Sequence, residues 1–123
     1  MPELPSGTVT FLFSDIEGST RLAQERASTW PDLLRRHQEL MRAAFAAHGG
    51  VEVGTEGDSF FAAFASAAGA VAAAADAQRA LVKEPWPEGC VIGVRIGMHT
   101  GEASVSGGTY VGVAVHRAAR IGD

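Results

Sequence analysis

The sequence predicts an α+β fold in which an antiparallel sheet is covered by helices on one face. Two observations lead to this prediction. Short apolar and aromatic runs, typical of strands, alternate with longer segments whose apolar residues recur at helical spacing. The segments follow one another as strand, helix, strand, strand, helix, strand, and a tight turn joins the two central strands. This is the split βαββαβ order of ferredoxin-like folds, with a helix in each crossover.

The N-terminal part predicts an arm, a strand and two helices. Residues 1–7 contain two prolines and form the arm, and the apolar run from Thr8 to Ser14 forms the first strand. A short helix is expected over Ser19–Glu25. Ser28 or Thr29 caps a longer helix that tolerates Pro31 in its first turn, runs to about His48 and ends at Gly49-Gly50. Its apolar side consists of Trp30, Leu33, Leu34, Leu40, Met41, Ala44 and Phe45.

The middle of the chain predicts a hairpin and an alanine-rich helix. Strands over Val51–Thr55 and Ser59–Phe64 flank the turn Glu56-Gly57-Asp58. Ser66 caps a helix over Ala67–Lys83, because alanine is the best helix former. The inner side of that helix is expected to consist of Val71, Ala74, Ala75, Gln78, Leu81 and Val82.

The C-terminal part predicts two strands and a further helix. A strand over Val91–Met98 is followed by a turn at His99–Glu102, a short strand at Ala103–Val105 and a loop at Ser106–Gly108. A helix is expected from about Val111 to the end, with no closing strand after it. We therefore expect one domain, residues 8–123, that is incomplete at its C-terminus and lacks its closing strands.

The composition excludes several classes of protein. Hydrophobic residues make up 46% of the 123 residues and charged residues 20%, so the chain can bury a core. The net charge of -4 argues against a nucleic-acid binder. A single cysteine, Cys90, excludes an internal disulfide and fits a reducing compartment. No signal peptide and no membrane-spanning run are recognisable, so a cytoplasmic location is expected.

Two acids could form a metal site. Asp15 follows the first strand and Asp58 lies in the hairpin turn, so the predicted topology allows both to reach the same end of the sheet. A divalent cation between two close carboxylates would remove their repulsion. The segment Glu17-Gly18-Ser19-Thr20 enters a helix, whose first N–H groups can bind phosphate oxygens. The alternative is that Asp15 caps the helix and Asp58 only fills a turn.

Two residues near the C-terminus could contact a phosphoryl group. His116 and Arg120 are four residues apart, which puts them on one face of the last predicted helix. A guanidinium group can stabilise negative charge that develops on a phosphoryl group. The alternative is a solvated helix face.

Five segments resemble the catalytic domain of class III adenylate/guanylate cyclases, especially its bacterial members. In the order of the family, they are TFLFSDIEGSTRL, VEVGTEGDSFFAAF, VRIGMHTGEA, YVG and VAVHRAARI, and together they touch most of the chain from Thr8 onward.

The resemblance implies conversion of a nucleoside triphosphate, ATP or GTP, to its 3′,5′-cyclic monophosphate and pyrophosphate. It implies two Mg²⁺ or Mn²⁺ ions per site, bound by Asp15, Asp58 and the main-chain carbonyl of Ile16. The turn Glu17–Thr20 would hold phosphates, and Arg120 would stabilise the transition state. It further implies a homodimer in which one subunit supplies the aspartates and the other supplies the arginine.

Three positions depart from the family pattern. Gly54 stands where a base-contacting lysine is usual, Thr109 where an aspartate is common, and His116 where an asparagine is usual. A non-catalytic regulatory or dimerisation module that binds nucleotide is therefore the alternative. A third possibility, a polymerase-palm-like or dinucleotide-forming cyclase, is disfavoured because the chain has HTGEA and AARI and lacks a GG[DE]EF-type turn.

Overall fold

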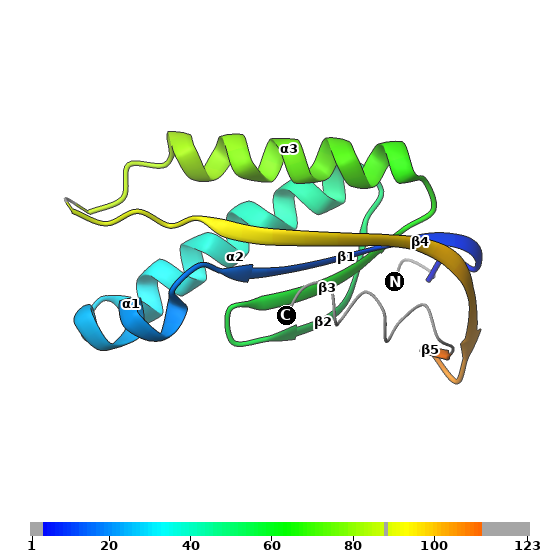
Figure 1. Cartoon of the computed structure of the whole chain (residues 1–123), viewed down its shortest axis with the longest axis horizontal. Coiled ribbons are helices and arrows are strands. Elements are labelled where there is room, and N and C mark those ends of the chain that lie inside the picture. The colour runs from blue at the N-terminus through cyan, green and yellow to red at the C-terminus, as the bar shows by residue number, and fades with distance from the viewer. Residues whose placement is uncertain (1–3, 88, 112–123) are drawn as a thin grey trace.

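The structure is a computed structural model that describes residues 4–87 and 89–111 (Figure 1). In chain order its elements are β1 (Gly7–Ile16), α1 (Ser19–Glu25), α2 (Trp30–Ala47), β2 (Val51–Glu56), β3 (Ser59–Phe64), α3 (Ala67–Lys83), β4 (Val94–Ser106) and β5 (Thr109–Val111). The predicted helix after Val111 lies outside the described residues. No helix among the described residues combines the length and the hydrophobicity that crossing a membrane requires.

The strands form one antiparallel sheet in the order β2-β3-β1-β4-β5. β1 is central, because it pairs with β3 on one side and with β4 on the other. This order confirms the ferredoxin-like arrangement predicted from the sequence. In Figure 1, β4 bends at the end that leads to β5, so the sheet curls at that edge.

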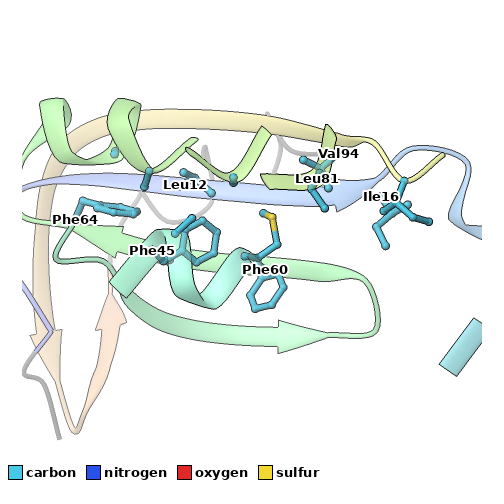
Figure 2. Close-up of a cluster of buried hydrophobic side chains, with 14 of the residues drawn as sticks. Leu12, Ile16, Phe45, Phe60, Phe64, Leu81 and Val94 are labelled. Atoms are coloured by element: carbon cyan, nitrogen blue, oxygen red, sulfur yellow. The ribbon is translucent and has the colours of Figure 1, made fainter. Parts of the chain in front are cut away.

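The main core lies between the sheet and the helices α2 and α3 (Figure 2). Alternate residues of β1, such as Leu12 and Ile16, face this core and are fully buried. Phe45 from α2 makes edge-to-face contacts with Phe60 and Phe64 of β3, at centroid distances of 5.6 and 6.1 Å. The helices thus cover one face, as predicted.

A smaller apolar cluster lies apart from the main core. Phe11 packs against Phe61 at 5.4 Å and edge-on against Tyr110 at 5.0 Å between ring centroids. The Tyr110 hydroxyl donates a 2.6 Å hydrogen bond to the Pro5 carbonyl. β5 and the N-terminal arm are therefore joined through the side chain of Tyr110.

The prediction of a turn at His99–Glu102 is wrong. These residues lie inside β4, which starts at Val94 rather than Val91 and continues without a break to Ser106. Each of them pairs with a residue of β1, and the hydroxyls of Thr10 and Thr100 are 2.8 Å apart. Pairing with a long neighbouring strand therefore outweighs the local turn signal of the His-Thr-Gly-Glu sequence. For the same reason β1 is longer than predicted and includes Gly7, Asp15 and Ile16.

The predicted inner side of α3 is also partly wrong. The buried residues are Ala70, Ala73, Ala77 and Leu81. Val71 and Val82 are 57% and 84% exposed, and Gln78 is exposed as well. Alanines occupy most positions of α3, so its hydrophobic pattern hardly distinguishes one side from another. The Ser66 cap is confirmed, since its hydroxyl accepts a 3.2 Å hydrogen bond from the Gly69 amide.

Candidate active site

The structure brings Asp15 and Asp58 together at one end of the sheet. Asp15 lies near the end of β1, and Asp58 lies in the turn between β2 and β3. A carboxylate oxygen of Asp58, Oδ2, accepts a 2.8 Å hydrogen bond from the backbone amide of Ile16, the residue that follows Asp15. Antiparallel pairing of Ser14 with Phe60 produces this proximity. Their role in metal binding stays a prediction.

Arg95 is a neighbour of this site that the sequence reasoning missed. It lies on β4 directly opposite Asp15, and its guanidinium donates to both carboxylate oxygens, with Nε–Oδ1 at 2.9 Å and Nη2–Oδ2 at 2.8 Å. The hydrogen bonds to Asp15 raise the pKa of Arg95, and the negative charges of Asp15, Glu17 and Asp58 add to this. Only the cross-strand register reveals the pair, because Asp15 and Arg95 are 80 residues apart.

The segment from Glu17 to Thr20 turns the chain from β1 into α1. Gly18 is the N-cap in the left-handed conformation, at φ 64°, and no side chain caps the helix. The Glu17 amide donates a 2.8 Å hydrogen bond to the Gly93 carbonyl, which anchors this turn to the start of β4. By helix geometry, the amides of Ser19 and Thr20 have no acceptor within α1. Phosphate binding by these residues stays a prediction.

Helix α2 supports the Asp58 turn from the core side. The side-chain amide of Gln38, Nε2, donates a 3.2 Å hydrogen bond to the backbone carbonyl of Gly57. His37 is fully buried, with its ring 5.6 Å from that of Phe60. Burial lowers the pKa of His37 to about 4, although the negative charge of Asp58 acts in the opposite direction.

Three buried polar atoms near this support make no hydrogen bond of good geometry within the part of the chain that the structure describes, although a weaker backbone interaction with Leu34 raises the pKa of His37. They are both ring nitrogens of His37 and the hydroxyl of Ser14. Ser14 pairs with Phe60 across β1 and β3, and His37 packs on the same phenylalanine. Unpartnered polar groups are costly in a core. Ser14 directly precedes Asp15 on β1, whereas His37 lies on α2.

Gly54 and Thr109 occupy different parts of the fold. Gly54 lies at a bulge in β2 and lines a pocket of about 540 Å³ with Phe13, Thr55, Glu56, Ser59, Phe60 and Phe61. A Cβ atom at Gly54 would meet nothing within 4 Å. Thr109 lies in β5, and its hydroxyl donates to the Ser106 carbonyl at 3.1 Å. Their predicted role in base selection stays untested.

Arg120 and His116 lie outside the described residues, so their predicted place at the site remains an expectation. Within residues 4–87 and 89–111, no group of three or more histidine, cysteine, aspartate or glutamate side chains could hold a metal ion. Metal binding by the acidic pair Asp15 and Asp58 stays a prediction.

Comparison with known proteins identifies the family. A family model for the adenylate and guanylate cyclase catalytic domain matches residues 1–113. An uncharacterised protein of Mycobacterium tuberculosis is 39% identical over 121 residues, which cover 97% of this chain and 40% of that protein. The chain thus spans well under half the length of this relative.

Solved structures give the same result. An adenylate cyclase from Trypanosoma brucei, solved in its monomeric state, superposes on this chain with a TM-score of 0.88 at 25% sequence identity. The match covers 98% of this chain and 69% of the Trypanosoma brucei chain. The guanylate cyclase domain from Catenaria anguillulae, in complex with GTP, has a TM-score of 0.77 at 26% identity, with coverage of 95% and 72%. The chain belongs to the adenylate and guanylate cyclase catalytic domain family.

Proposed function

We propose that this chain is the catalytic domain of a metal-dependent nucleotide cyclase that converts ATP or GTP to the 3′,5′-cyclic monophosphate and pyrophosphate. The observation that carries the proposal is the junction of the two acids, in which Asp58 accepts a 2.8 Å hydrogen bond from the amide next to Asp15. Membership of the cyclase family supports the reaction class.

The residues at this junction fit Mg²⁺ or Mn²⁺. Asp15 and Asp58 offer carboxylate oxygens, and Ile16 offers a main-chain carbonyl, which are the hard ligands these ions prefer. The described residues hold no larger acidic or histidine cluster. Water and triphosphate oxygens would therefore complete the coordination of both ions, as is usual for Mg²⁺ in phosphoryl-transfer sites. When bound, the ions would stabilise the attacking and leaving oxygens of the displacement.

The remaining roles belong to cationic and amide groups. The 3′ oxygen of the ribose forms a bond to the α-phosphorus while the bond to pyrophosphate breaks. Arg95 and the first amides of α1 lie next to the acids and are suited to phosphate oxygens. Arg120, with His116 on the same predicted helix face, would stabilise the charge that develops in the transition state. We propose that Arg120 comes from a second copy of the chain, so that each site of a homodimer is shared.

The test is product formation by the chain with Mn²⁺ and either ATP or GTP, measured by chromatography. We expect a cyclic nucleotide from at least one triphosphate, and we expect Asp15→Asn or Asp58→Asn to reduce the rate by at least about 100-fold, because a charged ligand is lost. Arg42→Gln, which breaks an exposed ion pair with Glu52, is the control and should retain activity. A folded dimer that forms no cyclic product from any triphosphate would contradict the proposal.

The alternative is a regulatory module that binds nucleotide without turnover. Gly54 favours it, since the glycine lines the pocket but offers no side chain to contact a base. Nucleotide binding without product, measured by calorimetry on the same dimer, would establish this alternative.

A further inference from the structure

Arg95 engages both oxygens of a carboxylate that the proposed function assigns to metal. The two hydrogen bonds are 2.9 and 2.8 Å long and run from two nitrogens of one guanidinium to the two oxygens of Asp15. The Asp15 side chain is only 16% exposed, whereas that of Arg95 is 56% exposed. The nearly buried carboxylate of Asp15 is therefore paired with a guanidinium that is open to solvent.

The position of Arg95 follows from the sheet and not from a flexible loop. Asp15 and Arg95 are paired residues of β1 and β4, so their side chains emerge on the same face of adjacent strands. The carboxylate of Asp58 accepts a hydrogen bond from the backbone amide of Ile16, the residue after Asp15. Without a nearby positive charge, the two carboxylates would repel each other.

We propose that Arg95 is a positioning residue for the metal site and acts through Asp15. When no divalent cation is bound, its guanidinium serves as the counter-ion of Asp15 and keeps the two acids assembled. A divalent cation must compete with this guanidinium for the Asp15 oxygens. The proposal rests on the proposed function to the extent that Asp15 and Asp58 are metal ligands.

The consequence is that removing the Arg95 charge should strengthen metal binding in the absence of nucleotide. We expect Arg95→Gln to raise the affinity for Mn²⁺ about tenfold, the size of effect that one unit charge at a distance of ~5 Å has on an ionic equilibrium. A residue with a purely structural role would give the opposite result, since its loss would loosen the site. Affinity is measured by titration of Mn²⁺ followed by electron paramagnetic resonance of the free ion.

A second readout is thermal stability. The Arg95→Gln chain should melt at a lower temperature than the original chain without Mn²⁺, because the acids then lack a counter-ion. The same variant should gain more in melting temperature when Mn²⁺ is added, since tighter binding stabilises the folded state more.

The chain offers matched controls. Arg42 makes a comparable two-bond contact with Glu52, with distances of 2.8 and 3.3 Å, near the start of β2 and away from the turn. Arg42→Gln should leave Mn²⁺ affinity unchanged. Arg95→Lys keeps the charge but loses the paired geometry, so its Mn²⁺ affinity should lie between those of Arg95→Gln and the original chain.

The outcomes separate this proposal from the proposed function. If Asp15→Asn abolishes Mn²⁺ binding and Arg95→Gln binds no more tightly than the original chain, the counter-ion role is wrong and the metal site stands. If Asp15→Asn binds Mn²⁺ as well as the original chain, the metal site itself is wrong. If Arg95→Gln does not fold, the Mn²⁺ affinity of Arg95→Lys tests the proposal instead. An affinity of Arg95→Lys for Mn²⁺ that is equal to or weaker than that of the original chain would overturn the proposal.

Discussion

The His37 imidazole has a strongly lowered pKa in the folded chain. It is fully buried, and its pKa is lowered to about 4 from the ordinary 6.5. Burial is the main cause, because a charged ring cannot be hydrated in the core. At neutral pH the folded chain therefore carries a neutral His37.

This shift predicts a loss of stability in mild acid. In the unfolded chain the ring has its ordinary pKa, so between 6.5 and about 4 the unfolded state binds a proton that the folded state does not. Above pH 6.5 the titration of His37 does not lower the free energy of unfolding. As the pH falls from 6.5 toward 4, it lowers this free energy by on the order of 3 kcal/mol in total.

Urea unfolding at about pH 7.5 and about pH 5 measures this effect. The original chain should lose more stability over that interval than His37→Leu, in which no imidazole titrates. His99→Gln, at a half-buried position on β4, should behave like the original chain. Equal losses in the original chain and in His37→Leu would show that other groups cause the acid sensitivity.

Helix α3 shows how an element can be predicted correctly while its orientation is not. Its bounds, Ala67–Lys83, and its Ser66 cap match the sequence prediction. Its buried side consists mainly of alanines, which pack against the sheet and α2, while the larger Val71 and Val82 point to solvent. A helix that packs close to a sheet needs small residues on its buried side. Because alanines occupy most positions of α3, the sequence does not show which of them form that side.

The orientation of α3 predicts opposite effects for two kinds of substitution. Ala77→Leu would force a large side chain into a fully buried position and should destabilise the fold by about 1–3 kcal/mol. Val82→Ala changes an exposed position and should alter stability by no more than about 0.5 kcal/mol. Urea midpoints of both variants check the prediction, and a larger effect of Val82→Ala would mean that the opposite side of α3 is buried.

In the molecule as a whole, the proposed function would divide the site between two copies of the chain. The described residues supply the acids, Arg95 and the start of α1, whereas Arg120 belongs to the proposed contribution of a partner. Neither copy alone would then assemble a complete site.

A mixing experiment tests this division. Asp58→Ala and Arg120→Ala should each be inactive alone, and a mixture should recover part of the activity, because one site of each heterodimer combines an intact pair of acids with an intact Arg120. Activity of the mixture is measured as cyclic nucleotide formed, after heterodimers are verified by mass. No recovery in a verified heterodimer would argue against a shared site.

The sequence by itself determined the order of elements up to α3, the ferredoxin-like sheet and the two acids of the candidate site. These follow from local patterns, since hydrophobic periodicity and turn residues set each helix and strand, and Asp15 and Asp58 stand next to such patterns. The hairpin turn thus follows from the sequence, and so does the end of β1 to within two residues.

The tertiary structure alone decided the continuity of β4, the buried side of α3 and the partner of Asp15. Each depends on residues far apart in the chain. Thr100 continues a strand because it meets Thr10, and Arg95 binds Asp15 because the register of β1 and β4 places them opposite each other. Such contacts result from pairing and packing between elements, and no local pattern in the sequence encodes them.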